Sequence, residues 1–244
     1  MMGLIRFIYF ALRRYYDSVN YAIEGILHAA KTQSHVRFHL ISSCFLLLIC
    51  FSLGIRPEEF IILTTLACIV IVGEMLNSAI EVTVDIASPE KSEQARIAKD
   101  IAAGAVLVAA LVSLIIGFFV FYPYVMYYVE HGIIIAKHGP IDLVFGSMII
   151  VLIVVIIIKA YVGKGYPLRG GMPSGHSSLL FAFWVNMVYI FQQPFLTVLV
   201  LVFAVGVAIS RIWRRIHTVY EVCMGVFVGA GITWSLYLIF YNGQ

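Results

Sequence analysis

The chain has 244 residues, of which 62% are hydrophobic and only 12% are Asp, Glu, Lys or Arg. An average soluble domain has roughly 45–50% apolar and about 25% charged residues, so this chain has too few polar side chains to cover a surface in contact with water. The composition argues against a soluble globular domain, a nucleic-acid-binding protein and a disordered protein, and it predicts an all-α polytopic membrane protein. The net charge of +3 says little about partners.

Residues 1–38 mix basic and apolar side chains, and their apolar run is too short to span a membrane. This pattern predicts one or two amphipathic helices on the membrane surface rather than a cleaved signal. The turn between the second and third apolar runs contains Ser88 and Pro89, which are typical of a helix start. Seven apolar runs predict seven spans, at residues 39–55, 60–80, 101–121, 143–158, 177–191, 195–209 and 219–241.

An aromatic segment of mixed polarity separates the third span from the fourth, as is typical of a connector at the membrane interface. We therefore expect a three-span module at residues 1–122, a connector at 123–142 and a four-span module at 143–244. With the N-terminus in the cytoplasm, 14 of the 16 Lys and Arg residues fall in cytoplasmic segments, and only Arg56 and Lys137 fall outside. Because basic loops stay in the cytoplasm, this asymmetry predicts the orientation.

Four oxygen-bearing side chains recur on one helical face of the second predicted span and its extension. They are Glu74, Asn77, Glu81 and Asp85. A carboxylate at membrane depth is costly and is kept only with a partner or a task; oxygen ligands suit Mg²⁺, and a carboxylate can also act as a base for an alcohol. Lys99 and Asp100 begin the next span at the same membrane face, where a cation would assist phosphoryl transfer from a nucleotide. A buried polar cluster between helices and an ion or proton pathway stay open as alternatives.

The pattern Glu74-x-x-Asn77-Ser78-Ala79-Ile80-Glu81-x-x-x-Asp85, followed by Ala98-Lys99-Asp100, resembles the prokaryotic diacylglycerol kinase and undecaprenol kinase family over about residues 18–122. The resemblance implies a small lipid kinase that uses Mg²⁺ and ATP, usually as a homotrimer whose sites are shared between protomers at the cytoplasmic face. It makes Glu74 the candidate base and assigns Asn77 and Glu81 to the metal or the phosphates. Lys99 and Asp100 become nucleotide-side residues, with Asp85 in the same site.

Gln33 departs from this family pattern, because it stands where a metal-binding Glu is expected. Its amide offers a carbonyl oxygen to Mg²⁺ but no charge. We therefore expect weaker metal binding and a kinase module that is either active or degenerate.

Two histidine motifs lie in the last third of the chain. Pro173-Ser174-Gly175-His176 begins the fifth predicted span, where a helix N-terminus offers backbone N–H groups to an anion. His217 and Glu221 lie one helical turn apart, so the carboxylate can orient the imidazole and raise its basicity. Arg211 precedes His217 by six residues and can bind a phosphate through two N–H groups. Either motif alone is commonly a topology anchor or an inert interfacial histidine.

Together the two motifs resemble the type-2 phosphatidic acid phosphatase superfamily over about residues 155–240. The resemblance implies that His217 is the nucleophile that takes the phosphoryl group and that His176 protonates the leaving oxygen. No metal or other cofactor is implied for this half. Phosphate binding is assigned to Ser174, Gly175, Ser210 and Arg211.

Three features depart from this second family. Glu221 replaces the usual Asp, and its extra methylene should shift the His217 ring or need a compensating helix movement. The family's first motif, Lys and six residues before Arg-Pro, is degenerate; we take Lys164 and Arg169 as its counterpart, although Lys159 lies ten residues before Arg169. The family core usually has six spans, whereas four follow residue 122.

The sequence thus predicts a two-module enzyme of the cell membrane, with both sites at the cytoplasmic face. The expected partners are the lipid bilayer, a phosphorylated lipid substrate such as phosphatidic acid or a polyprenyl phosphate or diphosphate, and further copies of the chain. A kinase and a phosphatase acting on one lipid would waste ATP, so we expect different lipids at the two sites or one site without turnover. A phospholipid transporter or flippase and a non-catalytic scaffold are the alternatives.

Overall fold

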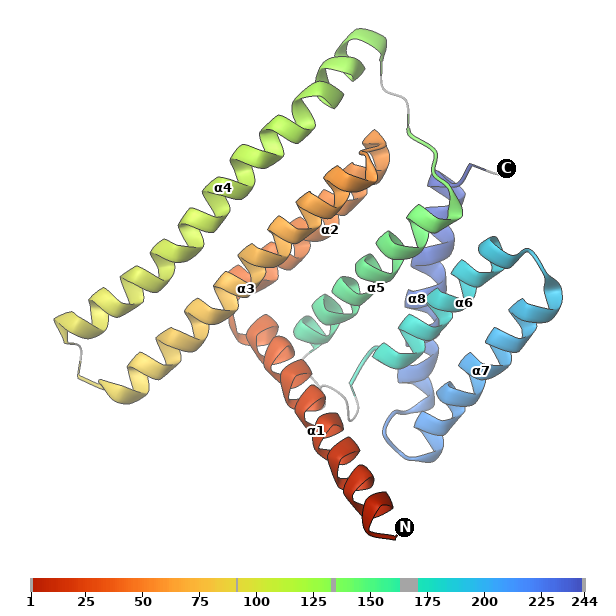
Figure 1. Ribbon diagram of the computed structural model, residues 1–244, viewed down its shortest axis with the longest axis horizontal. Helices are drawn as coiled ribbons and strands as arrows, with labels where there is room; N and C mark the ends of the chain where they lie inside the picture. The colour runs from red at the N-terminus through yellow and green to blue at the C-terminus, as the bar shows by residue number, and fades with distance from the viewer. Residues whose placement is uncertain (1, 91, 133–134, 163–170, 243–244) are drawn as a thin grey trace.

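The computed structural model describes residues 2–90, 92–132, 135–162 and 171–242. Within these ranges the chain is helical and contains no strand, apart from one isolated bridge between residues 138 and 241. The eight helices are α1 (Met2–Thr32), α2 (Ser34–Leu53), α3 (Pro57–Ala87), α4 (Glu93–His131), α5 (Pro140–Val162), α6 (Gly175–Phe191), α7 (Pro194–Trp213) and α8 (Val219–Phe240), as Figure 1 shows.

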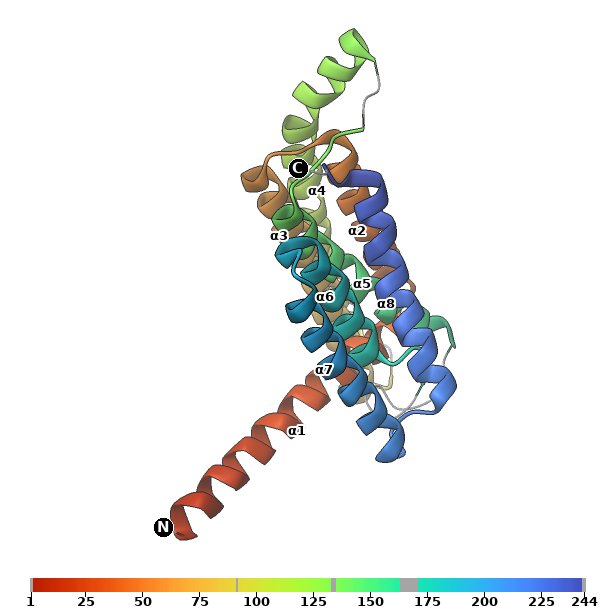
Figure 2. The same ribbon diagram turned by 90° about the vertical axis from the view of Figure 1, so that its right-hand side faces the viewer.

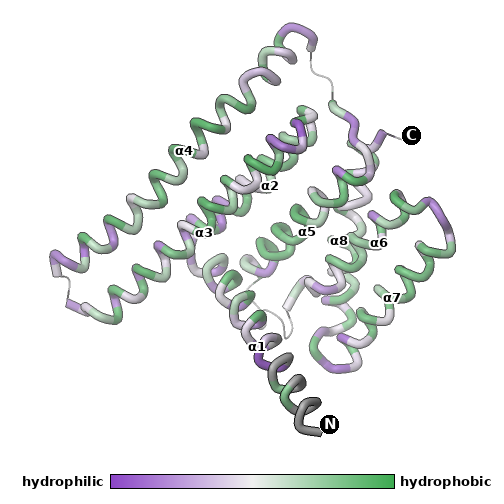
Figure 3. Tube along the Cα trace, in the orientation of Figure 1, coloured by the Kyte–Doolittle hydropathy of each residue, from purple (hydrophilic) through white to green (hydrophobic). Residues whose placement is uncertain are grey.

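Helices α2 to α5, α7 and α8 are long and apolar enough to cross a membrane, and α6 is a shorter apolar helix of 17 residues. They coincide with the seven predicted spans, and Figure 3 shows apolar residues along their length with polar residues towards their ends. The all-α polytopic membrane fold is therefore confirmed. The N-terminal segment forms one continuous helix, α1, that leaves the bundle obliquely (Figure 2).

The turn between α3 and α4 differs from the sequence prediction. Ser88 ends α3, since its N–H donates to the Val84 carbonyl, and its hydroxyl donates to the Glu90 carbonyl. Ser92 caps α4 instead, because its hydroxyl accepts the Ala95 N–H at 3.1 Å. The predicted helix start at Ser88 was therefore wrong. Ser88 forms hydrogen bonds within the turn, and Ser92 is the N-cap residue of α4.

Helix α4 continues through Pro123 to His131, so the first part of the aromatic connector is helical. Two tyrosines of this extension hold it against the turn between α2 and α3: Tyr124 donates to Glu59 Oε2 at 2.5 Å, and Tyr128 donates to the Leu53 carbonyl at 3.3 Å. These long-range contacts offset the local cost of a proline inside a helix.

The spans form two bundles that share one seam. Helices α2, α3 and α4 pack together, α6 packs against α5, α7 and α8, and α5 joins the bundles by packing against α1 and α2. Phe51 of α2 fills the space beside Gly146 of α5, where any side chain would collide with its ring. The buried core along this seam includes Leu40, Leu47, Leu143, Ile150, Ile153 and Tyr237.

The segment before α5 fastens both bundles at one end. The His138 N–H donates to the Phe240 carbonyl at 2.7 Å, and the Ala136 N–H donates to the Ser52 carbonyl at 3.1 Å. The opposite end carries the α3–α4 turn, the start of α2, the start of α6 and the α7–α8 turn, as Figure 1 shows. The described members of both sets of predicted site residues therefore lie towards the same end of the bundle.

Candidate active sites

Glu74 lies on α3 and faces His39 of α2. Glu74 Oε1 is 3.5 Å from His39 Nε2, and the two side chains are 12% and 23% exposed. The carboxylate thus has an imidazole partner at the interface of two spans. His39 was not among the predicted site residues, because nothing in its local sequence signals the contact across the helices.

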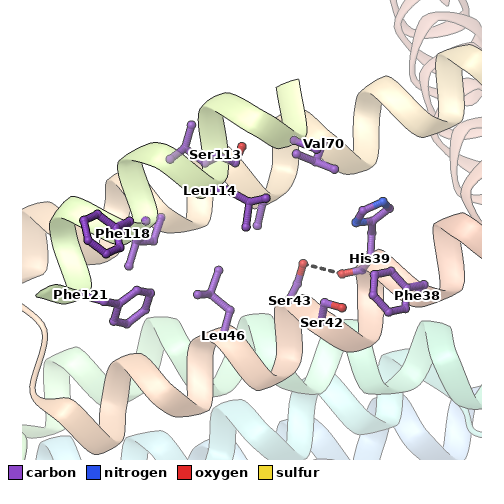
Figure 4. Close-up of a pocket in the computed structure, with 15 residues that line it drawn as sticks. Phe38, His39, Ser42, Ser43, Leu46, Val70, Ser113, Leu114, Phe118 and Phe121 are labelled. Carbon is purple, nitrogen blue, oxygen red and sulfur yellow. Dashed lines mark hydrogen bonds between the residues drawn. The ribbon is translucent and has the colours of Figure 1, made fainter. Parts of the chain in front are cut away.

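His39 also lines a cavity of about 760 Å³ between α2, α3 and α4. Figure 4 shows His39 near one end of this cavity and Phe118 and Phe121 towards the other. Most of the lining is apolar, and the exceptions include Ser42 and Ser43, on α2 beside His39. The cavity therefore suits an apolar chain that ends in a small polar group.

Asn77 and Glu81 form a second polar group on α3. Asn77 Nδ2 donates to Glu81 Oε1 at 3.1 Å, while Asn77 Oδ1 is buried and has no hydrogen-bond partner among the described residues. An acceptor left unpaired inside a protein costs free energy unless a donor or a cation binds there. This oxygen pair therefore fits a hard cation such as Mg²⁺.

Ion pairs link the residues around the α3–α4 turn. Lys99 Nζ lies 2.5 Å from Asp85 Oδ1, which joins α4 to the end of α3. Asp100 pairs with Arg96 at 2.6 Å, and Arg96 also binds Glu93. The predicted cation and acids therefore lie close together, but Asp100 is engaged by a residue that the sequence analysis had not selected.

Gln33 occupies the N-cap position of α2, between α1 and α2, and makes no side-chain capping bond with the described residues. Across the described part of the chain, no group of three or more His, Cys, Asp or Glu side chains is placed to hold a metal ion.

His217 lies between α7 and α8, is buried, and has its Nδ1 3.0 Å from Glu221 Oε2. A carboxylate only accepts hydrogen bonds, so Nδ1 carries the proton and Nε2 keeps its lone pair. Burial lowers the pKa of His217 below its ordinary value, although the hydrogen bond to Glu221 opposes this shift. Burial thus favours the uncharged form of this imidazole.

Glu221 is held by three further contacts. Its carboxylate accepts the N–H groups of Thr218 and Gly171, each at 3.0 Å, and the Thr218 hydroxyl accepts the Glu221 N–H in a capping box. The longer side chain that replaces Asp thus still reaches His217 at an ordinary hydrogen-bond distance.

The start of α6 lies against this pair. Ser174 is fully buried, its N–H donates to the Glu221 carbonyl at 3.0 Å, and its hydroxyl accepts from Ser177. Ser174 holds the N-cap position, yet no capping bond from its side chain occurs in the described structure. His176, in the first turn, interacts electrostatically with His217. The first N–H groups of α6, which have no acceptor within the helix, are therefore held near the two histidines.

Arg211 lies in the last turn of α7 and interacts electrostatically with His176 and His217. Its Nε is buried, and within the described ranges it has no hydrogen-bond partner. The neighbouring Ser210 instead donates its hydroxyl to the Val207 carbonyl at 2.7 Å. The buried Nε of Arg211 therefore offers an unused donor to an anion, whereas the Ser210 proton is already engaged.

Lys159 is buried at the end of α5 and interacts electrostatically with Glu221, His176 and His217. Lys164 and Arg169, which the sequence analysis preferred, lie outside the described residues. Spacing along the chain had given Lys159 little weight. Its position after sixteen largely apolar residues, at the end of a span, was the signal that could have selected it.

Comparisons with known proteins agree with this division into two sites. Residues 20–121 match the model of the prokaryotic diacylglycerol kinase family. The undecaprenol kinase of Bacillus subtilis is 38% identical over 112 residues, which are 46% of this chain and 91% of the relative. The chain belongs to the prokaryotic diacylglycerol kinase family. Diacylglycerol kinases of Synechocystis sp. and Haemophilus influenzae are 36% and 30% identical, over 41% and 43% of this chain and 58% and 91% of the relatives.

Residues 159–244 match the model of the PAP2 superfamily. The chain is therefore a fusion of a kinase-family module and a PAP2 module, as the two sequence patterns predicted. Lys159, the residue that the structure adds to the second site, is the first residue of the PAP2 match. No solved structure matches this chain significantly.

Proposed function

We propose that the chain is a two-site enzyme of lipid phosphates, with both sites at the cytoplasmic face of the cell membrane. The kinase-family module phosphorylates a lipid alcohol with ATP, and the PAP2 module hydrolyses a phosphorylated lipid. Membership of the two families supports lipid kinase and lipid phosphatase chemistry in general. The basic residues at one end of the spans and the cytoplasmic supply of ATP support the orientation. We take residues 1–122 and 143–244 as the modules and residues 123–142 as their connector.

In the PAP2 module, His217 attacks the phosphorus through Nε2. The phosphorus–oxygen bond to the lipid breaks, and His176 gives a proton to the departing oxygen. Water then attacks the phosphohistidine, which releases phosphate and restores the imidazole. Glu221 keeps the ring oriented and its other nitrogen protonated.

The phosphoryl oxygens are bound by the cations and N–H groups around the two histidines. Arg211 and Lys159 neutralise their charge, and the N-terminus of α6 at Ser174 and Gly175 donates N–H groups. We keep Ser210, Lys164 and Arg169 as predicted additional ligands. The observation that carries the proposal is the buried Arg211 Nε, which has no partner in the described structure and lies beside the His217–Glu221 pair.

Release of phosphate from lipid phosphates by the purified full chain tests this proposal. His217→Ala should lower the rate by about three orders of magnitude, because no other group takes its place as nucleophile, and His176→Ala should also lower it. His131→Ala, an exposed histidine at the opposite end of the bundle, is the matched control. Phosphate release that survives His217→Ala would refute the mechanism, and lipid flux across liposomes that survives it would favour a transporter.

In the kinase-family module, Glu74 accepts the proton of the lipid hydroxyl while the lipid chain lies in the cavity beside His39. The undecaprenol kinase relative supports a polyprenol as this alcohol. Asn77 and Glu81, with Gln33 as a weaker ligand, would hold Mg²⁺, which supplies charge neutralisation for the nucleotide phosphates. Lys99, Asp85 and Asp100 belong to the nucleotide side.

We also propose that the chain functions as a homo-oligomer, with a trimer as the expected form. Membership of the prokaryotic diacylglycerol kinase family supports a kinase site that is completed between copies. The apolar outer face of α4, with exposed residues such as Leu107, Leu114 and Phe118, is available for contact with lipid or with further copies.

A further inference from the structure

His39 lies between the proposed base of the kinase site and the cavity that we assign to the lipid chain. Its Nε2 is 3.5 Å from Glu74 Oε1 on α3, and its ring lines the cavity between α2, α3 and α4. Figure 4 shows this ring pointing from α2 into the space between the helices. Glu74 itself does not line the cavity, although Val70, one helical turn before it, does. The imidazole therefore separates the carboxylate from an alcohol that is bound in the cavity.

The lining of the cavity offers one group that can take a proton. Among the described residues that line it, His39 is the only one with an acidic or basic side chain, and the polar remainder are serines. Two of these serines already donate to carbonyls of their own helices, Ser43 at 2.7 Å and Ser113 at 2.8 Å. Histidine is the commonest general base in enzymes, whereas a serine hydroxyl is too weak a base for this task. A proton that leaves an alcohol inside the cavity must therefore pass to His39.

The chemistry of the two side chains suits a proton relay. Because the Glu74 carboxylate can only accept a hydrogen bond, the Nε2 nitrogen that faces it carries the imidazole proton, and Nδ1 keeps a lone pair. The separation of 3.5 Å is longer than an ordinary hydrogen bond, as catalytic contacts often are before the substrate binds. A charge at membrane depth is costly. A proton that moves on to Glu74 leaves neither an isolated imidazolium nor a carboxylate beside the developing alkoxide.

We propose that His39 is a catalytic residue of the kinase site, which takes the proton of the lipid alcohol and passes its own proton to Glu74. The inference rests on the proposed kinase function. The alcohol oxygen lies against Nδ1 of His39, at the end of the cavity that Ser42 also lines. The lipid chain extends from there towards Phe118 and Phe121, at the other end of the cavity in Figure 4. Glu74 thus acts on the alcohol through the imidazole.

The reaction balances with a nucleoside triphosphate as the only co-reactant. The alcohol oxygen forms a bond to the terminal phosphorus, the bond from that phosphorus to the bridging oxygen breaks, and the electron pair leaves on the nucleoside diphosphate. In the same step the hydroxyl proton moves to His39 Nδ1 and the Nε2 proton moves to Glu74. After the product has left, Glu74 returns its proton to Nε2, and the Nδ1 proton passes to water, which restores the starting pair.

ATP-dependent phosphorylation of a polyprenol by the purified full chain in detergent micelles tests the relay. His39→Gln keeps a polar side chain of similar size but cannot carry a proton. We therefore expect kcat to fall about hundredfold, while KM for the polyprenol changes by less than about threefold. His131→Ala removes an exposed histidine from the last turn of α4, at the opposite end of the bundle, and is the matched control. It should leave both constants unchanged.

Free imidazole separates a catalytic role of His39 from a structural one. His39→Ala leaves room beside Glu74 for the ring that it removes, so added imidazole should raise its kcat about tenfold or more. The same imidazole should not raise the rate of His39→Gln, whose side chain fills the space, or of Glu74→Gln, which lacks the final proton acceptor. Because the two groups act in series, His39→Gln combined with Glu74→Gln should be no slower than Glu74→Gln alone.

The outcomes separate this inference from the function on which it rests. If the unmodified chain transfers no phosphate from ATP to a lipid alcohol, the kinase function is refuted and the relay with it. If the unmodified chain is active and His39→Gln keeps its kcat within about threefold, the relay alone is refuted. A higher KM with an unchanged kcat would also overturn it, since His39 would then only bind the lipid. A loss that imidazole does not restore, and that adds to the loss from Glu74→Gln, would overturn it as a purely structural effect.

Discussion

Glu221 and Gln33 are two positions at which the chain departs from its families, and their surroundings differ. Glu221 is fully integrated, because His217, Thr218 and Gly171 all hydrogen-bond to its carboxylate. The expected shift of the imidazole is therefore absorbed by a turn that fits the longer side chain. Gln33, at the N-cap of α2, has no comparable anchoring by its side chain in the described structure.

Gln33→Glu should raise the kinase activity. A carboxylate binds Mg²⁺ more tightly than an amide, so we expect kcat/KM for ATP-dependent phosphorylation of a polyprenol to rise about tenfold, at a lower Mg²⁺ requirement. Radiolabel transfer from ATP to the lipid at several Mg²⁺ concentrations measures this, and Glu74→Gln in the same background should remove the activity. An unchanged Mg²⁺ dependence would count against Gln33 as a metal ligand.

At the residue scale, local spacing predicted contacts that lie within one helix and its cap. The four-residue spacing of His217 and Glu221 and of Asn77 and Glu81 gave pairs that the structure contains. Contacts between helices could not be predicted in this way. Lys159 comes from another span, and its proximity to the histidines depends on how α5 packs beside α6 and α8.

Among the elements, α6 and α8 approach so closely that side chains are excluded between them. A Cβ atom at Gly225 would lie 2.6 Å from the Ser174 carbonyl oxygen, and one at Gly229 would overlap the backbone at Ser178. The small-residue pair Gly225 and Gly229 therefore sets the position of the start of α6, and with it the distance between His176 and His217.

Gly225→Ala should damage the phosphatase more than the fold. The new methyl group pushes the Ser174 backbone away from α8, so we expect kcat for phosphate release to fall about tenfold or more, with a destabilisation of about 1–3 kcal/mol. Gly231→Ala is the matched control, because a Cβ there meets nothing within 4 Å. Phosphate release and the melting temperature are measured for both variants. Equal phosphate release by the two would argue that the α6–α8 distance does not position His176.

Sequence periodicity predicted the elements better than their ends. Apolar runs identified every span, because a segment that crosses lipid must be apolar along its length. The end of α3 and the start of α4 were misplaced, since Ser88 and Ser92 are equally good caps by sequence and only the turn geometry distinguishes them. The extension of α4 past Pro123 depends on tertiary bonds from Tyr124 and Tyr128.

On the scale of the whole molecule, the two sites differ in the share of their residues that a single chain supplies. The described PAP2 residues come from α5, α6, α7 and α8, which pack together within a single chain. The kinase-family residues lie on α2, α3 and α4, and membership of the kinase family supports a site that is completed between copies. The PAP2 site is therefore expected to work in a monomer and the kinase site to need neighbouring copies.

Dissociation of the oligomer should separate the two activities. Dilution into excess detergent should lower the kinase rate per chain in step with the loss of trimers, while phosphate release per chain stays within about twofold, because its groups come from one chain. Mass photometry at each dilution gives the oligomeric state beside both rates. A parallel fall of the two activities, or a kinase rate that is independent of assembly, would contradict this division.

The contact between the Phe51 ring and Gly146 constrains how the two modules can change in evolution. Neither module can change its side of this contact alone. A larger residue at Gly146 would displace the Phe51 ring, and a smaller residue at Phe51 would leave a cavity. Homologues with the same fusion should therefore change positions 51 and 146 together. A chimera that takes one module from another homologue should pack poorly at this contact unless both residues come from the same protein.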